Sequence, residues 1–227
     1  LAACKVLLDT MHRQSLNADS DTFTSLIGGC HQKGLWKQAL LLLTKAKRLK
    51  LTSSSTYNEA LKACARGKQP RMAMMLLAEM DEGVGTWVAS ESITTAMATC
   101  AKVGLWIQAI ELLFRLKARN LQPSPETYSA ATASCAAGAQ WQRALCFMEE
   151  SIQQKQTNGH VFAAAVIACQ NSWELVLSVL VSMRQARVAP IARTYRDVLR
   201  LFAAQGKATD VAVKFLEEPL QELGEVF

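Results

Sequence analysis

The sequence lacks the short motifs by which most enzyme families are recognised. It contains no phosphate-binding loop, no H-E-x-x-H helix and no Ser/His/Asp order of the kind that hydrolases use. Its three histidines, His12, His31 and His160, are scattered along the chain. We therefore expect a protein that is not an enzyme, that carries no cofactor and that has no small-molecule substrate.

Long apolar runs are missing as well. The richest apolar stretch, residues 161–183, is interrupted by Gln170, Asn171, Ser172 and Glu174. Because a membrane-spanning helix needs about 18 or more consecutive apolar residues, no transmembrane span is expected.

Close cysteine pairs are the third absence. Seven cysteines are present, but none forms a C-x-x-C pair, and the closest two are Cys135 and Cys146. Zinc sites and redox motifs depend on close pairs, so neither a metal site nor a structural disulfide is expected. Five cysteines recur instead at separations of 34, 36, 35 and 34 residues: Cys30, Cys64, Cys100, Cys135 and Cys169. Regular spacing over most of a chain is the signature of internal repeats.

Each recurring cysteine ends an apolar pattern typical of one helical face. Tyr57, Ala60, Leu61 and Cys64 follow the spacing i, i+3, i+4 and i+7, which places them on one side of a helix. The same pattern begins at Phe23, Ile93, Phe162 and Tyr195, and Tyr128 also precedes its cysteine by seven residues. A turn glycine then follows in five units, at Gly34, Gly67, Gly104, Gly138 and Gly206. A second apolar series begins soon after each turn with a small residue such as Ala39, Ala73 or Ala109.

Each unit is therefore predicted to be a helical hairpin made of a first helix, a turn and a second helix. One hairpin cannot bury its own apolar face, so neighbouring hairpins must stack. The predicted fold class is all-α, an α-solenoid superhelix of about 35-residue repeats. The six predicted units span 20–53, 54–89, 90–124, 125–158, 159–191 and 192–227, the last as a degenerate cap. Residues 1–19 are predicted to be the second helix of a preceding repeat, so the chain is expected to be part of a longer protein.

The repeat resembles the pentatricopeptide repeat (PPR). The resemblance is carried by the run Tyr57-Asn58-Glu59-Ala60-Leu61, followed by Gly67, Ala73, Leu77 and Met80. The glycine and tyrosine that the rival tetratricopeptide repeat places inside its first helix are not found here. A tryptophan precedes the small residue of the second helix by three positions in four units, at Trp36, Trp106, Trp141 and Trp173. This variant is similar to arrays common among algal PPR proteins, and the tryptophans are expected to pack between repeats.

The resemblance implies a protein that binds single-stranded RNA in mitochondria or plastids, one base per repeat. It implies that the base is read by the residue directly after the aromatic of the first helix, together with the last residue of the unit. We call these the reader position and the closing position. Carried over, the pairs are Thr24 with Ser53, Asn58 with Ala89, Thr94 with Ser124, Ser129 with Asn158, Ala163 with Ile191, and Arg196 alone. Ser129 with Asn158 resembles a pair that favours adenine, whereas Ala163 and Ile191 cannot hydrogen-bond a base.

The charge pattern supports RNA binding in part. The net charge is +6 and the isoelectric point is near 9.0, which fits an anionic partner. Basic residues in or just after the first helices are candidates for phosphate contacts: Lys62, Arg66, Lys102 and Arg200, with Lys33 and Lys68. Those that end the second helices, Lys45, Lys47, Arg48, Lys50, Arg115, Lys117 and Arg119, are expected to face solvent. Asp21, Glu91 and Glu126, each three residues before a reader position, would repel phosphates.

Two functions therefore remain open. The chain is predicted either to bind single-stranded RNA weakly, aiding RNA maturation, stability or translation, or to be a degenerate PPR scaffold. In the second case its partners would be protein subunits of a large organellar assembly, such as a ribosome or an energy-converting membrane complex.

Overall fold

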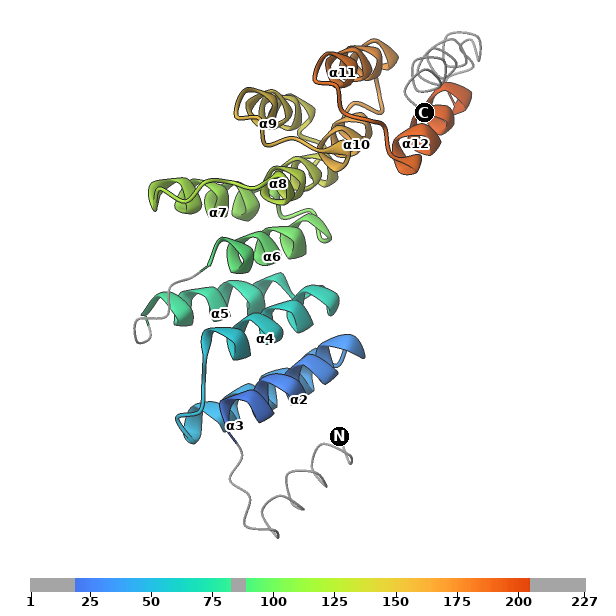
Figure 1. The fold of residues 1–227 in the computed structure, drawn as a ribbon. Coiled ribbons are helices and arrows are strands. Elements are labelled where there is room, and N and C mark those ends of the chain that lie inside the picture. The colour runs from blue at the N-terminus through green and yellow to red at the C-terminus, as the bar shows by residue number, and fades with distance from the viewer. Residues whose placement is uncertain (1–18, 83–88, 205–227) are drawn as a thin grey trace, which may run out of the picture. The chain divides into compact units, whose positions relative to one another are not determined.

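The computed structural model describes residues 19–82 and 89–204, in which helices are joined by short turns and no strand occurs (Figure 1). The predicted all-α fold is confirmed. Of the predicted leading segment 1–19 only Asp19 is described, and residues 205–227 of the predicted cap, Gly206 among them, lie outside the described residues. None of the helices in the described part of the chain combines the length and apolarity that a membrane crossing requires.

Eleven helices are described, and they alternate between the first and second helices of successive hairpins. The first helices are α2 (Ser20–Gln32), α4 (Ser54–Arg66), α6 (Ser90–Ala101), α8 (Pro125–Ala137), α10 (Gly159–Ala168) and α12 (Ala192–Ala204). The second helices are α3 (Trp36–Arg48), α5 (Pro70–Glu82), α7 (Trp106–Ala118), α9 (Trp141–Gln153) and α11 (Trp173–Gln185). The chain divides into unit 1, residues 1–122, and unit 2, residues 123–227.

Side-chain caps start most of the first helices. Ser53 and Ser124 each accept a hydrogen bond from the backbone N–H three residues later, and Thr56 and Thr127 return the contact to the Ser backbone. These reciprocal bonds form capping boxes that satisfy otherwise orphan donors. Asp19 caps α2 in the same way by accepting from the Thr22 backbone N–H at 2.7 Å.

The turn between the two helices of a hairpin repeats the same hydrogen bond. The backbone carbonyl of the recurring cysteine accepts from the N–H five residues later, at 2.9 Å for Cys30, 2.9 Å for Cys64, 3.0 Å for Cys100 and 2.8 Å for Cys135. Such a bond needs one residue with positive φ in the turn. Gly34 and Gly104 supply it in two repeats, whereas Lys68 and Ala139 supply it in the two where the glycine comes one residue earlier.

The core of each unit lies between its first and second helices. In unit 1, α2, α4 and α6 pack side by side, and α3, α5 and α7 cover them. Ala39, Ala73 and Ala109 are buried where each second helix crosses, because a small residue allows close approach. In unit 2, α8, α10 and α12 pack side by side in the same manner, around Tyr128, Phe162 and Val198.

The five recurring cysteines are buried, as the spacing predicted. Burial raises the pKa of Cys64, Cys100, Cys135 and Cys169 to about 11. They are therefore neutral thiols near pH 7, and they pack as small apolar residues.

Candidate functional site

The reader positions lie near the start of successive first helices. In unit 1 they are Thr24 on α2, Asn58 on α4 and Thr94 on α6, and all three are partly buried. In unit 2 they are Ser129 on α8, Ala163 on α10 and Arg196 on α12. Ser129 is partly buried, Ala163 is buried and Arg196 is exposed. Because the helices within each unit lie side by side, neighbouring reader positions form a row.

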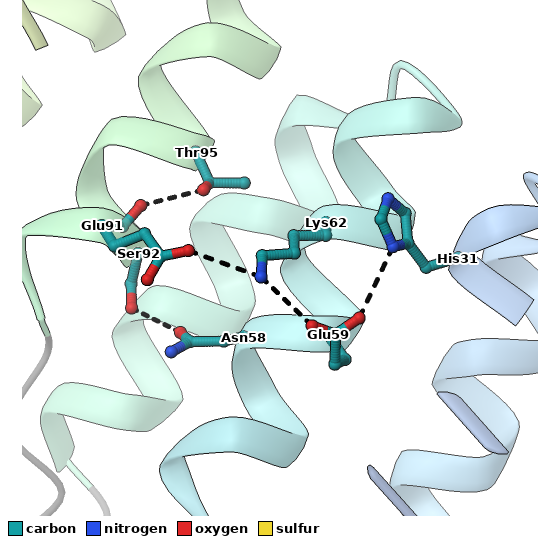
Figure 2. A network of polar contacts seen from close by, with 7 residues as sticks. All are labelled: His31, Asn58, Glu59, Lys62, Glu91, Ser92 and Thr95. Atoms are coloured by element: carbon teal, nitrogen blue, oxygen red, sulfur yellow. Dashed lines mark hydrogen bonds and ion pairs between the residues drawn. The ribbon is translucent and has the colours of Figure 1, made fainter. Parts of the chain in front are cut away.

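Two readers are joined by hydrogen bonds to the next repeat. The Thr24 hydroxyl lies 3.0 Å from the Thr56 hydroxyl, and the Ser92 hydroxyl donates to Asn58 Oδ1 at 2.5 Å (Figure 2). Thr56 and Ser92 hold the same position, directly before the aromatic or large apolar residue of their helix. Sequence reasoning missed this position, although Thr22, Thr127 and Thr194 show that a hydroxyl recurs there.

These bonds limit what each reader offers a ligand. The Thr24 and Thr94 hydroxyls donate to the backbone carbonyls of Ser20 and Ser90, each at 2.9 Å. Neither hydroxyl therefore has its proton left to donate to a ligand. Asn58 uses its carbonyl oxygen on Ser92 and keeps its amide nitrogen as a donor. The Ser129 hydroxyl forms no hydrogen bond among the described residues.

The closing positions serve as helix caps. Ser53, Ser124 and Asn158 are the N-cap residues of α4, α8 and α10. Asn158 Oδ1 accepts from the backbone N–H groups of His160 and Val161, each at 3.1 Å, so its amide nitrogen remains as a donor. Ala89 begins α6 without a side-chain cap. The Ser-x-x-Thr spacing at Ser53 and Ser124 was the sequence signal for this role.

A chain of charged contacts crosses α2, α4 and α6 (Figure 2). His31 Nδ1 lies 3.5 Å from Glu59 Oε2, Glu59 Oε1 lies 3.1 Å from Lys62 Nζ, and Lys62 Nζ lies 3.4 Å from Glu91 Oε1. The hydrogen bond to Glu59 is the main cause that raises the pKa of Lys62, which therefore stays charged. Lys62 is thus already neutralised by two carboxylates, and Glu91 carries less unbalanced charge than the sequence suggested.

The remaining candidate cations differ in their surroundings. Lys102 Nζ donates to the Ala65 backbone carbonyl at 3.1 Å and so joins the end of α4 to the residue that caps α6. Arg66 and Arg200 are exposed, and neither forms an ion pair within the described residues. Arg196 Nε lies 3.6 Å from the neighbouring Asp197.

The cations that end the second helices are not simply solvated, which corrects the expectation for three of them. Lys47 pairs with Glu79, and its ammonium lies 5.2 Å from the centre of the Tyr57 ring. Arg115 and Arg119 both pair with Asp81. These contacts tie a second helix to the next or preceding one and reduce the charge left for a ligand.

Asp21 and Glu126 remain as exposed carboxylates without an ion pair among the described residues. Each lies three residues before a reader position, as the sequence showed. In the same part of the chain no group of three or more potential metal ligands is present. The arrangement therefore offers polar contacts and charge to a partner, within a protein class defined by stacked helical hairpins.

Comparison with known proteins agrees with this class. A family model described as the PPR repeat matches residues 21–51 and 55–83. The pentatricopeptide repeat-containing protein At2g01860 of Arabidopsis thaliana is 22% identical over 198 residues, covering 85% of this chain and 40% of that protein. The chain therefore matches the PPR repeat in two successive units and is similar to a PPR protein over most of its length.

Solved structures share the fold. PPR10 in complex with an 18-nt psaJ RNA element has a TM-score of 0.66 at 21% identity, covering 97% of this chain and 32% of that chain. A structure of PPR10 from maize has the same TM-score at 18% identity and covers 97% of this chain and 31% of that one. The PPR domain of Arabidopsis thaliana protein-only RNase P 1 in complex with tRNA has a TM-score of 0.56 at 16% identity. The match covers 86% of this chain and 94% of that one. The chain thus spans less than half of At2g01860 and about a third of PPR10.

Proposed function

We propose that this chain is the RNA-binding part of an organellar PPR protein and that it binds single-stranded RNA across its first helices. The observation that carries the proposal is the row of reader side chains in unit 1. Thr24 and Asn58 hold equivalent positions on neighbouring helices, and each is oriented by a hydrogen bond to the next repeat. Successive repeats can therefore present successive polar groups to successive bases.

The reading of sequence is proposed to be weak and uneven. Ser129 with Asn158 is the most complete pair, because the hydroxyl has no partner among the described residues and the amide nitrogen is left as a donor. Neither the Thr24 nor the Thr94 hydroxyl has a proton left to donate to a base. Ala163 with Ile191 offers the base edge nothing polar. Contacts with the RNA phosphates would supply affinity without sequence preference, and the candidates for them are Arg66, Lys102, Arg200 and Arg196.

The chain itself is proposed to bind RNA and not to transform it. Several structural neighbours belong to RNase P proteins, and one of those structures is the PPR domain alone with tRNA. A role in RNA maturation, stability or translation in a mitochondrion or plastid is part of the same proposal, and it is supported by the similarity to PPR proteins.

Binding of short, labelled single-stranded RNA at several salt concentrations tests the proposal. The affinity is expected to fall as salt rises from about 50 mM to 200 mM, because phosphate contacts release counterions. A duplex of the same sequence is the matched control, and it should compete poorly because its bases are stacked and paired. Absence of binding to any single strand at the lowest salt would refute RNA binding.

A protein scaffold within an organellar assembly is the second candidate. It is favoured by Asp21 and Glu126, the unpaired carboxylates beside the readers, and by exposed apolar side chains on the second helices of unit 1. Leu41, Met75 and Phe114 are 64%, 52% and 60% exposed. Purification from the native organelle after nuclease treatment separates the two. A scaffold stays in a stoichiometric protein complex, whereas an RNA-held chain is released.

A further inference from the structure

The fifth repeat has a shorter first helix than its neighbours. The N-cap residue lies four positions before the aromatic residue in both helices: Ser124 before Tyr128 in α8, and Asn158 before Phe162 in α10. Helix α8 continues to Ala137, two residues beyond Cys135, whereas α10 ends at Ala168 and Cys169 is its C-cap. The Ser172 N–H donates to the Cys169 carbonyl at 3.0 Å, so this hydrogen bond spans three residues. The corresponding bonds to Cys30, Cys64, Cys100 and Cys135 span five. The chain therefore turns earlier into α11.

The early turn changes the surroundings of a tryptophan. In unit 1 the Trp36 side chain lies against Gly67, in the hairpin turn of the next repeat. A Cβ placed on Gly67 would lie 2.4 Å from Trp36 Cδ1. Trp141 holds the equivalent position at the start of α9, and the next turn is the shortened one after α10. Its side chain is 41% exposed, whereas Trp36 is partly buried.

The space beside Trp141 is an open pocket of about 210 Å³ within unit 2. Trp141 lines it together with Cys169, Asn171 and Ser172 from the turn after α10 and with Ala136 and Ala139 from the end of α8 and its turn. None of the lining side chains carries a charge. The volume lies below the roughly 300–1,000 Å³ of sites for drug-sized ligands, so the pocket suits a single planar ring system.

The polar groups of the pocket are those that a base edge would meet. The Asn171 amide is exposed and forms no hydrogen bond among the described residues, so it offers both a donor and an acceptor. Ser172 is already engaged, since its hydroxyl accepts from the Leu175 N–H at 3.5 Å and donates to Glu174 at 2.8 Å. An uncharged pocket with an aromatic face and one free amide matches a neutral heterocycle better than a phosphate.

We propose that this pocket holds one unstacked nucleobase of the bound RNA, with the base stacked on Trp141 and hydrogen-bonded to Asn171. The proposal rests on RNA binding as the function. It differs from the reader site, because Cys169 lies about 9 Å along α10 from the reader position Ala163. The fifth repeat, whose reader position cannot hydrogen-bond a base, would thus contact the strand at the other end of its helix.

Substitution of Trp141 tests the pocket in the whole chain. Stacking of one base on an aromatic ring contributes to the binding free energy of a single strand. Trp141→Ala should therefore weaken binding of a short single strand by about 5- to 150-fold. Trp141→Phe should retain most of the affinity, since a phenyl ring still stacks. Asn171→Ala should narrow the difference in affinity between strands of different base composition. Phe114→Ala removes another exposed aromatic from a second helix and should leave binding unchanged.

The indole N–H signal of Trp141 gives a second readout that does not depend on affinity. It should shift when the strand is added, and again when adenosine, guanosine, cytidine or uridine monophosphate is added at high concentration, whereas inorganic phosphate should not shift it. If RNA binds but Trp141→Ala binds equally well and the signal does not move, the pocket proposal is wrong and RNA binding stands. If no strand binds, the function fails, and an unshifted signal with mononucleotides then refutes the pocket independently.

Discussion

At the scale of single residues, the hydroxyl before each aromatic is the feature that joins repeats. Thr56 and Ser92 are buried and bond the readers Thr24 and Asn58. In unit 2 the equivalent Thr194 is 1% exposed, and its hydroxyl has no hydrogen-bond partner among the residues that the structure describes. The corresponding reader is Ala163, which has no polar atom in its side chain. A buried hydroxyl without a partner destabilises the fold by about 1–3 kcal/mol.

Ala163→Ser should therefore stabilise the protein. The new hydroxyl would face Thr194 as Thr24 faces Thr56, and the free energy of unfolding should rise by about 0.5–1.5 kcal/mol. Urea denaturation followed by circular dichroism measures the change. The double variant Ala163→Ser with Thr194→Val is the control and should lose the gain. A gain of equal size in the double variant would show that the hydrogen bond is not its cause.

The buried cysteines predict how stability depends on alkaline pH. The pKa of Cys64 and Cys100 is about 11 in the folded chain, raised from 9.0 by burial. A thiol whose pKa is raised by folding leaves stability unaffected below pH 9, where both states are protonated. Above pH 9 the unfolded chain ionises first, so the free energy of unfolding falls by up to roughly 2 kcal/mol per thiol by pH 11.

Reversible urea denaturation at pH 8 and at pH 10.5, with reductant present, measures this decline. Cys64→Ala with Cys100→Ala should make the decline shallower, whereas Cys146→Ala, at the exposed cysteine, should not alter it. Equal slopes in all three chains would mean that other groups control the alkaline response.

At the scale of helices, charged contacts between neighbours decide how much positive charge is available to RNA. Glu59 holds Lys62 on α4 and contacts His31 on α2, while Glu91 on α6 also approaches Lys62. These groups are partly exposed, so each pair contributes little to stability, about 0–1 kcal/mol. Their larger effect is on charge at the surface beside the readers.

Glu59→Gln should therefore raise RNA affinity while changing stability by less than about 1 kcal/mol. It removes a negative charge and leaves Lys62 with Glu91 as its one remaining carboxylate among the described residues, so the dependence of log affinity on log salt should steepen by up to about one phosphate contact. Glu79→Gln is the matched control, because it releases Lys47 on a second helix. If both variants change binding alike, the first helices are not the RNA-contacting face.

At the scale of the whole molecule, the chain is an array in which each hairpin is stabilised by its neighbours. In such arrays the stability is close to a sum of repeat and nearest-neighbour contributions. The chain divides into residues 1–122 and 123–227 as separate compact units. A local loss of packing should therefore affect its own unit most.

Leu61→Ala should make this visible. Leu61 is fully buried in α4, and truncation of a buried leucine costs about 2–5 kcal/mol. Amide hydrogen exchange should lose protection in α2, α4 and α6, while α10 and α11 retain most of theirs. Leu41→Ala, at an exposed leucine of α3, is the control and should change neither unit. Uniform loss across all helices would show that the array unfolds as one cooperative body.

The helical-hairpin fold could be predicted from the recurrence of one pattern about every 35 residues in the sequence. The recurrence of Cys30, Cys64, Cys100, Cys135 and Cys169, each seven residues after a large apolar residue, predicted paired helices and buried thiols, because a helical face fixes which residues meet the core. The reader and closing residues were named by family resemblance, and their contacts with RNA stay a prediction. The capping roles of Ser53 and Ser124 are encoded locally, in the Ser-x-x-Thr spacing that the two sites share.

The sequence by itself determined the hairpins, since their packing depends on residues close together along one chain. Only the tertiary structure decided which polar groups remain free. Glu59 neutralises Lys62, Asp81 engages Arg115 and Arg119, and Ser92 occupies the carbonyl of Asn58. Apart from Glu59 with Lys62, each of these pairs joins two residues that lie about one repeat apart in the sequence. Whether such residues meet in space depends on where each helix ends. Trp173 follows Cys169 by four residues, whereas Trp36, Trp106 and Trp141 follow their cysteines by six. This shorter turn is visible in the sequence, but the pocket beside Trp141 exists only once the helices are stacked.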